Sequence, residues 1–226
     1  MDSGKFWRRH LPRSTSLLSL CLIVACAAAG AQPAADDTAA GVATLEAFLR
    51  DVHTLTADFK QELWSADQRL LQTETGTLAL RRPNRFRWIY AKPTQLTVVA
   101  DGSKLWTYDV ELAQVTVAPL DSTVESTPAM LLSGDRNVRD SFNVVQTEQL
   151  DGIEWIKLAP KKGGTDFSSL RIGFKGKAPQ QLELVDGLNQ VTRIELKNLA
   201  VNPDLQDGTF EFKPPAGVDV IGNGEG

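Results

Sequence analysis

Cysteine is almost absent from this chain of 226 residues. Its two cysteines, Cys21 and Cys26, both lie within the first 31 residues. If those residues are removed on export, the remaining chain has no thiol. Disulfides, thiol catalysis and cysteine metal sites are then excluded from the mature protein.

Histidine and the motifs of common enzymes are equally scarce. His53 is the one histidine after residue 31. The sequence contains no Gly-x-Ser-x-Gly elbow, Walker loop, dinucleotide fingerprint, calcium loop or His-rich metal spacing. These absences favour a role without catalysis, and we expect neither a cofactor nor a metal.

Long apolar runs are limited to one, at residues 17–28. It is shorter than the roughly 20 residues that span a bilayer. Basic residues precede it and Ala29-Gly30-Ala31 follows it, which is the pattern of a secretory signal. We therefore expect cleavage of residues 1–31, a mature chain from Gln32, and a periplasmic location. The segment ending at Cys26 also resembles a lipobox, which would instead leave that cysteine lipidated.

Basic residues are in the minority, and more so after cleavage. Residues 32–226 contain 20 Lys or Arg and 27 Asp or Glu, a net charge of −7. This charge argues against nucleic acid and anionic lipid surfaces as main partners, because both attract basic proteins. A chain of this length can bury a sizeable core, so we expect one monomeric domain at 32–226.

Strand patterns dominate what is present. A helix is predicted at about 39–53, where Leu45, Leu49 and Val52 recur at helical spacing. Tight turns such as Asp101-Gly102 punctuate the rest and predict short hairpins. About 11 strands are expected, at 54–66, 68–81, 85–91, 95–101, 104–109, 112–118, 142–149, 153–160, 167–175, 179–186 and 190–199. Their spacing is typical of a large antiparallel meander or barrel.

The strand predicted at 85–91 carries aromatic residues on one face. Phe86, Trp88 and Tyr90 alternate with Arg85, Arg87 and Ile89, and successive side chains of a strand point to opposite faces. So apolar a face must be covered, either by a packed core or by an apolar ligand.

The strands are interrupted at residues 119–141. Within this segment Pro128 and Gly134 bracket a predicted helical turn, with proline in its first turn and glycine at its end. Its apolar centre, Met130-Leu131-Leu132, needs burial. It could cover the open side of the sheet or plug a core, and the segment alone does not decide between these roles.

A set of ordered motifs spans nearly all of the chain after residue 32. They are Phe59-Lys-Gln61, Gly76-Thr-Leu, Arg82-Pro-Asn-Arg-Phe-Arg-Trp88, Asp101-Gly102 with Leu105-Trp-x-Tyr108, Gln114-Val115, Pro128-Ala-Met-Leu-Leu132, Asp186-Gly-x-Asn-Gln-x-Thr192 and Phe210-x-Phe-x-Pro-Pro-x-Gly-Val-Asp219. Together they resemble the LolA family of periplasmic lipoprotein carriers.

The resemblance implies a fold, a cargo and two partners. The fold is mainly β, a half-open antiparallel β-barrel of about 11 strands. An α-helical lid closes an apolar cavity that holds the acyl chains of a lipoprotein. An inner-membrane ABC transporter of the LolCDE type would load the carrier, and an outer-membrane receptor of the LolB type would unload it.

The resemblance also implies site residues. The family's arginine that tethers the lid corresponds to Arg82, and its lid helix to Pro128 to Ser133. The expected lid-gating residues are Arg82, Pro128, Met130, Leu131, Leu132 and Ser133. The expected acyl-chain site comprises Leu63, Leu78, Phe86, Trp88, Leu96, Val98, Leu182 and Leu184.

Other functions remain open at this point. A lipid-anchored receptor resembling LolB would require modification of Cys26. A lipid-sensing domain of an envelope-stress regulator could use the same fold. An enzyme acting on lipids is a further alternative.

Overall fold

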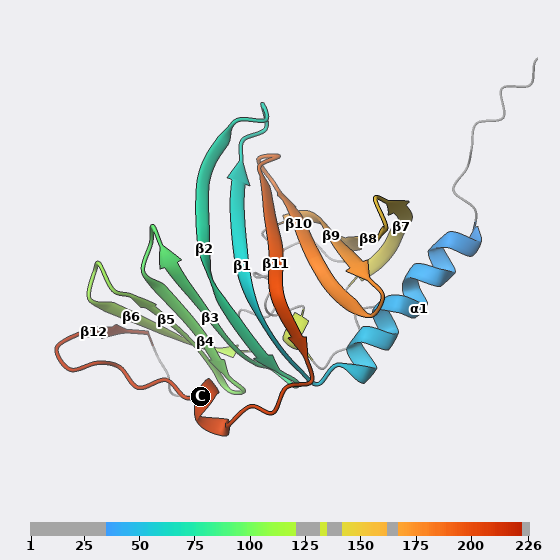
Figure 1. Ribbon diagram of the computed structural model, residues 1–226. Helices are drawn as coiled ribbons and strands as arrows, with labels where there is room; N and C mark the ends of the chain where they lie inside the picture. The colour runs from blue at the N-terminus through green and yellow to red at the C-terminus, as the bar shows by residue number, and fades with distance from the viewer. Residues whose placement is uncertain (1–34, 121–131, 135–141, 162–166, 223–226) are drawn as a thin grey trace, which may run out of the picture. The chain divides into compact units, whose positions relative to one another are not determined.

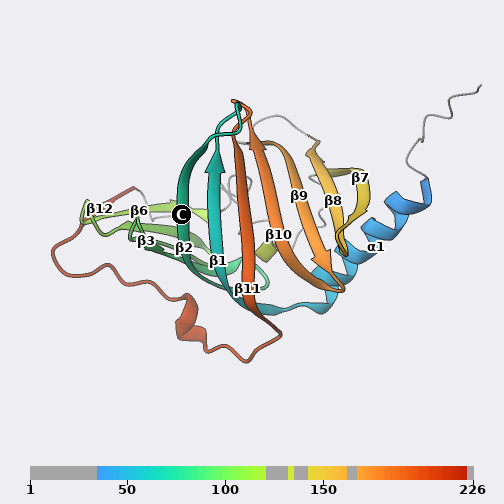
Figure 2. The same ribbon diagram turned by 45° about the horizontal axis from the view of Figure 1, so that its top comes forward.

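The computed structural model describes residues 35–120, 132–134, 142–161 and 167–222, all within the compact unit Pro33–Gly226. In these residues one long helix accompanies a single twelve-stranded sheet (Figure 1). The sheet curves strongly across its width (Figures 1 and 2). The elements are α1 Ala35–Asp51, β1 Thr54–Trp64, β2 Leu70–Arg81, β3 Arg85–Lys92, β4 Leu96–Asp101, β5 Lys104–Asp109, β6 Gln114–Pro119, β7 Phe142–Leu150, β8 Ile153–Pro160, β9 Phe167–Lys175, β10 Ala178–Asp186, β11 Val191–Val201, the 3₁₀ helix η2 Asp207–Phe210 and β12 Asp219–Ile221.

The sheet is built from two runs of hairpins that meet in its middle. Its strand order is β12-β6-β5-β4-β3-β2-β1-β11-β10-β9-β8-β7. The junction is the long antiparallel pairing of β1 with β11, in which Phe59 faces Leu196 and Leu63 faces Thr192. The end strands β12 and β7 do not pair with each other, so the sheet remains open. The predicted half-open antiparallel architecture is confirmed.

Two details differ from the prediction. The helix begins at Ala35 instead of 39. It ends at Asp51 instead of 53, because Asn202 accepts from the main-chain N–H of His53 at 2.8 Å and donates to the Asp51 carbonyl at 2.9 Å. These bonds satisfy the end of the helix and start β1.

The second difference is a twelfth strand. β12 is three residues long and pairs in parallel with β6, so the sheet is not purely antiparallel. Its three residues are all exposed, so they show no alternation of apolar and polar positions from which a strand could be predicted. Their pairing depends on where the C-terminal segment packs.

The hairpin turns adopt the backbone conformation that their residues favour. Gly102 has φ +104° between β4 and β5, and Asp151 and Gly152 have φ 54° and 75° between β7 and β8. Glycine and aspartate tolerate this left-handed region better than other residues. The turn predicted at Asp101-Gly102 is thereby confirmed.

The main apolar core lies on one face of the sheet, which we call the inner face. Helix α1 packs on that face against β7 and β8. Its Phe48 ring meets the Phe174 ring of β9 edge to face, with centroids 5.5 Å apart. Leu132, in a short helical stretch, is also buried in this core. The opposite, outer face carries charged side chains and, over β3 to β6, the C-terminal segment.

Candidate functional site

The inner face is a continuous apolar surface made by cross-strand rows. Directly paired residues share a face, so the register identifies each row. On the β1–β4 side the rows are Leu55–Leu80–Phe86–Ala100, Ala57–Leu78–Trp88–Val98 and Phe59–Gly76–Tyr90–Leu96. On the β8–β11 side they include Ile194–Leu182–Ile172–Ile156 and Thr192–Leu184–Leu170–Leu158.

An aromatic cluster occupies the centre of this face. The Phe59 ring lies 4.8 Å from Trp88 and 5.2 Å from Tyr90, between centroids. Gly76 makes this packing possible. A Cβ there would lie 1.8 Å from the carbonyl oxygen of Ile89 and 2.8 Å from the Phe59 ring. The glycine of the Gly76-Thr-Leu motif is therefore required by close packing.

The eight residues expected to contact acyl chains all lie on the inner face. Leu78, Phe86, Trp88, Leu182 and Leu184 are buried, while Leu63, Leu96 and Val98 are half-buried. The structure thus brings the whole set onto one surface. Their contact with a lipid stays a prediction, because the same side chains also pack as core.

Arg82 joins two segments that cover the inner face. It follows β2 at the sheet end where α1 stops. Its Nη1 donates to the carbonyls of Phe48, Leu49 and Val52 in α1 and just after it, at 3.2 and 3.4 Å for the first two. Its Nη2 donates to the carbonyl of Leu132 at 2.6 Å. One guanidinium therefore bridges the C-terminal end of the helix and the segment at 132–134.

The Arg82 guanidinium is held in an apolar setting. Its Cζ lies 4.5 Å from the centroid of the Phe48 ring, a cation–π arrangement. Burial lowers the pKa of Arg82 to about 10. The group therefore remains charged at neutral pH and keeps its planar set of donors.

The expected lid is described in part. Leu132 and Ser133 are buried, and the main-chain N–H of Asn84 donates to the Ser133 carbonyl at 2.8 Å. Pro128, Met130 and Leu131 lie outside the described residues. The use of α1 carbonyls by Arg82 was not predicted. The unpaired carbonyls at the end of any helix are the signal that could have suggested it.

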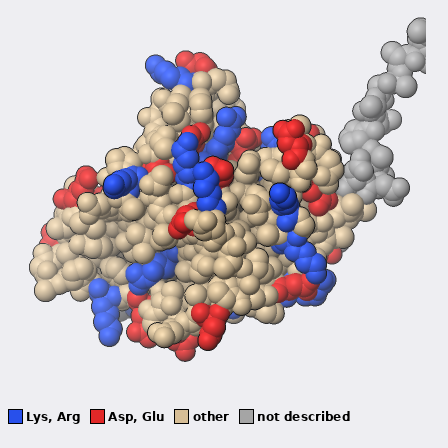
Figure 3. All heavy atoms as spheres, in the orientation of Figure 1, with Lys and Arg blue, Asp and Glu red and all other residues tan. Residues whose placement is uncertain are grey.

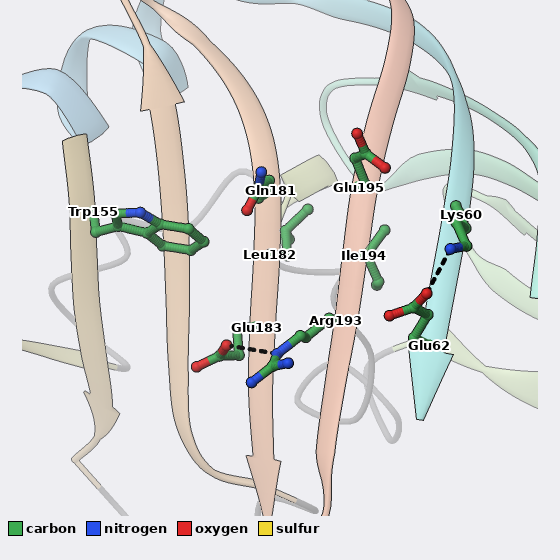
Figure 4. Close-up of a pocket in the computed structure, with 9 residues that line it drawn as sticks. All are labelled: Lys60, Glu62, Trp155, Gln181, Leu182, Glu183, Arg193, Ile194 and Glu195. Carbon is green, nitrogen blue, oxygen red and sulfur yellow. Dashed lines mark hydrogen bonds and ion pairs between the residues drawn. The ribbon is translucent and has the colours of Figure 1, made fainter. Parts of the chain in front are cut away.

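The outer face has different chemistry. Arg193 pairs with Glu183 at 3.1 Å, and Lys60 with Glu62 at 2.5 Å, across and along the strands. These groups border a hollow of about 360 Å³ on β1, β10 and β11, together with Trp155 (Figure 4). Basic and acidic side chains are intermixed on the face of the molecule that Figure 3 shows. Such a hollow suits water and ions better than an alkyl chain.

The C-terminal segment covers the outer face of β3 to β6. Arg87 donates to the carbonyls of Thr209 and Glu211, both at 2.7 Å. Phe210 is buried, and the Phe212 ring lies 5.7 Å from that of Trp106. This second covered surface was not predicted from the sequence.

Groups able to perform catalysis or bind metal are few. In the described part of the chain, no group of three or more His, Cys, Asp or Glu side chains could hold a metal ion. Among the same residues, no helix is long and apolar enough to cross a bilayer. The arrangement offers apolar surface and a hydrogen-bonded cover, which suits the binding of an apolar group.

Comparisons with known proteins agree with this geometry. A model of the family described as outer membrane lipoprotein carrier protein LolA matches residues 50–213. The outer-membrane lipoprotein carrier protein of Dechloromonas aromatica is 39% identical over 184 residues, which cover 81% of this chain and 88% of that protein. The protein of the same description from Halorhodospira halophila is 37% identical over 211 residues, covering 93% and 95% of the two chains.

A solved structure shares the fold at low sequence identity. An uncharacterized conserved protein from Thermus thermophilus matches with a TM-score of 0.50 at 12% identity, over 81% of this chain and 98% of that one.

Proposed function

Because this chain belongs to the LolA family of outer membrane lipoprotein carrier proteins, we propose that it carries lipoproteins through the periplasm. It receives them from an inner-membrane ABC transporter of the LolCDE type and passes them to an outer-membrane receptor of the LolB type. Such a role needs no catalysis by the carrier itself.

The observation that carries the proposal is the apolar inner face, covered by two segments that a single arginine joins. Exposing an acyl chain of about 16 carbons to water costs roughly 0.8 kcal/mol per CH₂, which is on the order of 10 kcal/mol per chain. A carrier must offer apolar area of similar extent. The rows of β1–β4 and β8–β11 provide it.

Release is the second requirement, because the periplasm offers no nucleotide to drive it. The lid-gating residues Arg82, Pro128, Met130, Leu131, Leu132 and Ser133 would open the cover and close it behind the departing cargo. Because each hydrogen bond contributes only about 1 kcal/mol net, opening the cover has a small free-energy cost. Closure of the empty carrier then favours transfer to the receptor.

The acyl chains are proposed to lie on Leu63, Leu78, Phe86, Trp88, Leu96, Val98, Leu182 and Leu184. Since most of these are buried, loading must separate the covering segments from the sheet. The half-buried Leu63, Leu96 and Val98 would meet the cargo first.

The same proposal includes export and cleavage. Residues 1–31 act as a signal, and residues 32–226 form the carrier domain. Mass spectrometry of the periplasmic protein should give the unmodified mass of a chain starting near Gln32. A diacylglyceryl group on Cys26 would instead support a membrane-anchored receptor.

The direct test is release of labelled lipoprotein from spheroplasts. Added protein should bring newly made lipoprotein into the supernatant as a complex and should then deliver it to outer membranes. Heat-denatured protein is the control. If native protein binds no lipoprotein and releases none, the carrier function is wrong.

A further inference from the structure

One polar patch interrupts the apolar inner face. It consists of Gln61 on β1, Gln72 and Glu74 on β2, Tyr90 on β3, and Thr94 after it. Gln61 faces Glu74 directly in the β1–β2 register, one row beyond Phe59 and Gly76. The patch therefore lies beyond the aromatic cluster, toward the end of the sheet that is opposite Arg82.

The side chains of the patch hydrogen-bond to one another, but one acceptor atom has no donor. Both Gln72 Nε2 and Thr94 Oγ1 donate to the same oxygen, Glu74 Oε1, the latter at 2.8 Å. The Tyr90 hydroxyl donates to Gln61 Oε1 at 3.3 Å. Burial, reinforced by the nearby charge of Glu74, raises the pKa of Tyr90 to about 12. The hydroxyl thus remains a donor throughout the physiological range.

Four buried side-chain polar atoms have no hydrogen-bond partner among the described residues: Glu74 Oε2, Arg82 Nε, Trp88 Nε1 and Thr147 Oγ1. Glu74 Oε2 is the one carboxylate oxygen among them. Glu74 is 5% exposed, and its Oε2 is buried with no hydrogen-bond donor among the described residues. Buried polar atoms are normally paired, because an unpaired one loses its hydration without compensation. A buried carboxylate oxygen without a donor, at the edge of the apolar rows, suits a ligand that supplies the missing donor.

The position of this acceptor restricts the ligand. An amphipathic molecule that lays its alkyl chains on the apolar rows would place its polar junction at the patch. That junction must carry a hydrogen-bond donor, and cationic or neutral groups suit a carboxylate. An anionic headgroup, such as that of a free fatty acid, would meet like charge.

We propose that Glu74 Oε2 accepts a hydrogen bond from the nitrogen at the lipid-modified N-terminus of the cargo. This nitrogen is either the amide N–H of an N-acylated cysteine or the α-ammonium of a cysteine without the N-acyl chain. The inference rests on the carrier function proposed above. It adds a specificity: the site accepts acylated amino groups and rejects anionic lipids.

The test uses Glu74→Gln, which keeps the shape and an acceptor for Thr94 but can replace Oε2 by an amide donor. The probes are a triacylated cysteinyl peptide, a diacylated one with a free α-amine, and palmitate. Glu74→Gln should bind the triacylated peptide about tenfold more weakly, the loss expected for one hydrogen bond to a charged group. The diacylated peptide should lose more, because its ion pair is lost too.

Palmitate should respond in the opposite direction and bind Glu74→Gln several-fold more tightly, because the repelling carboxylate is gone. A purely structural role for Glu74 would weaken all three probes together. Glu74→Asp retains the charge on a shorter side chain. Its affinity for each probe should lie between those of the unaltered protein and of Glu74→Gln. The control is Glu111→Gln, which removes an exposed carboxylate from the β5–β6 turn and should change none of the affinities.

The possible failures are distinguishable. If the unaltered protein binds neither peptide, the carrier function itself fails. If it binds both and Glu74→Gln retains the same peptide and palmitate affinities, the role of Glu74 is wrong and the carrier function stands.

Discussion

Two segments cover the inner face of the sheet and one covers the outer face, and arginines hold both covers by donating to main-chain carbonyls. On the inner side Arg82 binds the end of α1 and Leu132. On the outer side Arg87 binds the segment at 209–211, and Arg81 binds the carbonyl of Leu205. Arg82 and Arg87, which belong to one sequence motif, thus serve opposite faces.

The two covers differ in how they are attached. The outer segment is held by Arg81 and Arg87, by the buried Phe210, and by the β12–β6 ladder. In the inner cover, Arg82 is the side chain that joins α1 to residues 132–134, and the main-chain N–H of Asn84 adds a bond to the Ser133 carbonyl. We expect the inner cover to be the one that opens, because its two segments share the donors of a single side chain.

Removing that bridge should have the largest effect. In Arg82→Leu the inner cover loses the donors that its two segments share. At about 1–1.5 kcal/mol for each of two or three bonds, this loss shifts the balance toward the open form by roughly 30- to 2000-fold. The variant should accept lipoprotein but pass it on poorly in an assay that scores loading and unloading separately. Arg82→Lys should be intermediate or near normal.

The adjacent arginine supplies the control. Arg81→Leu removes donors to the outer segment and should leave both transfer steps near normal. If Arg82→Leu instead failed at loading and unloaded normally, Arg82 would contact the donor complex and would not hold the cover.

The faces can be compared within one strand. Val98 and Thr97 are neighbours on β4, both half-buried, on the inner and outer faces respectively. Val98→Glu should lower the affinity for an acylated peptide at least tenfold, because an unpaired charge beside an alkyl chain costs several kcal/mol. Thr97→Glu should bind normally. If both variants fold and lose the same peptide affinity, the acyl-chain site is not confined to the inner face.

Loosening the outer cover should affect stability and not transport. Arg87→Ala removes two hydrogen bonds and should lower the free energy of unfolding by about 2 kcal/mol, or the melting temperature by about 4–8 °C. Calorimetry measures the shift. Loading and unloading should stay within twofold of normal, and a selective loss of unloading would show that the outer segment also gates release.

The smallest expected effect depends on pH. Burial opposes the charge of Asp101, but hydrogen bonds from Trp106 Nε1 and the N–H groups of Lys104 and Ser103 outweigh it and lower the pKa of this carboxyl below 3.8. Its stabilisation is therefore present above that pH and is lost as the pH falls through the folded-state pKa.

Asp101→Asn tests this linkage. At pH 7 the variant should be less stable by about 1 kcal/mol in urea unfolding. The difference should narrow as the pH falls from 3.8 through the lower folded-state pKa, at which the native carboxyl becomes protonated. A constant difference across that range would show that the charge contributes nothing.

The sequence predicted the local features of the fold well. Every end of the 11 predicted strands lies within two residues of the observed one, because turns such as Asp101-Gly102 and alternation as in Phe86 to Tyr90 are encoded locally. The common face of the eight proposed acyl-chain residues follows from the same alternation.

Long-range features were not predictable in the same way. The partners of Arg82 and Arg87 lie 30 to 50 and more than 120 residues away in sequence, and no local pattern specifies them. The incomplete hydrogen bonding of Glu74 is likewise visible only once Gln72 and Thr94 have both been placed on one oxygen.

Tryptophan fluorescence tests the central claim, that acyl chains occupy the inner face, most directly. Trp88 lies on the inner face of β3, and Trp106 on the outer face of β5 against Phe212. Two variants, each retaining one of these tryptophans with the others replaced by phenylalanine, would be loaded with a cysteinyl peptide carrying brominated acyl chains, which quench on contact. Trp88 should be quenched and Trp106 should not. Quenching of Trp106 with Trp88 unaffected would contradict the account.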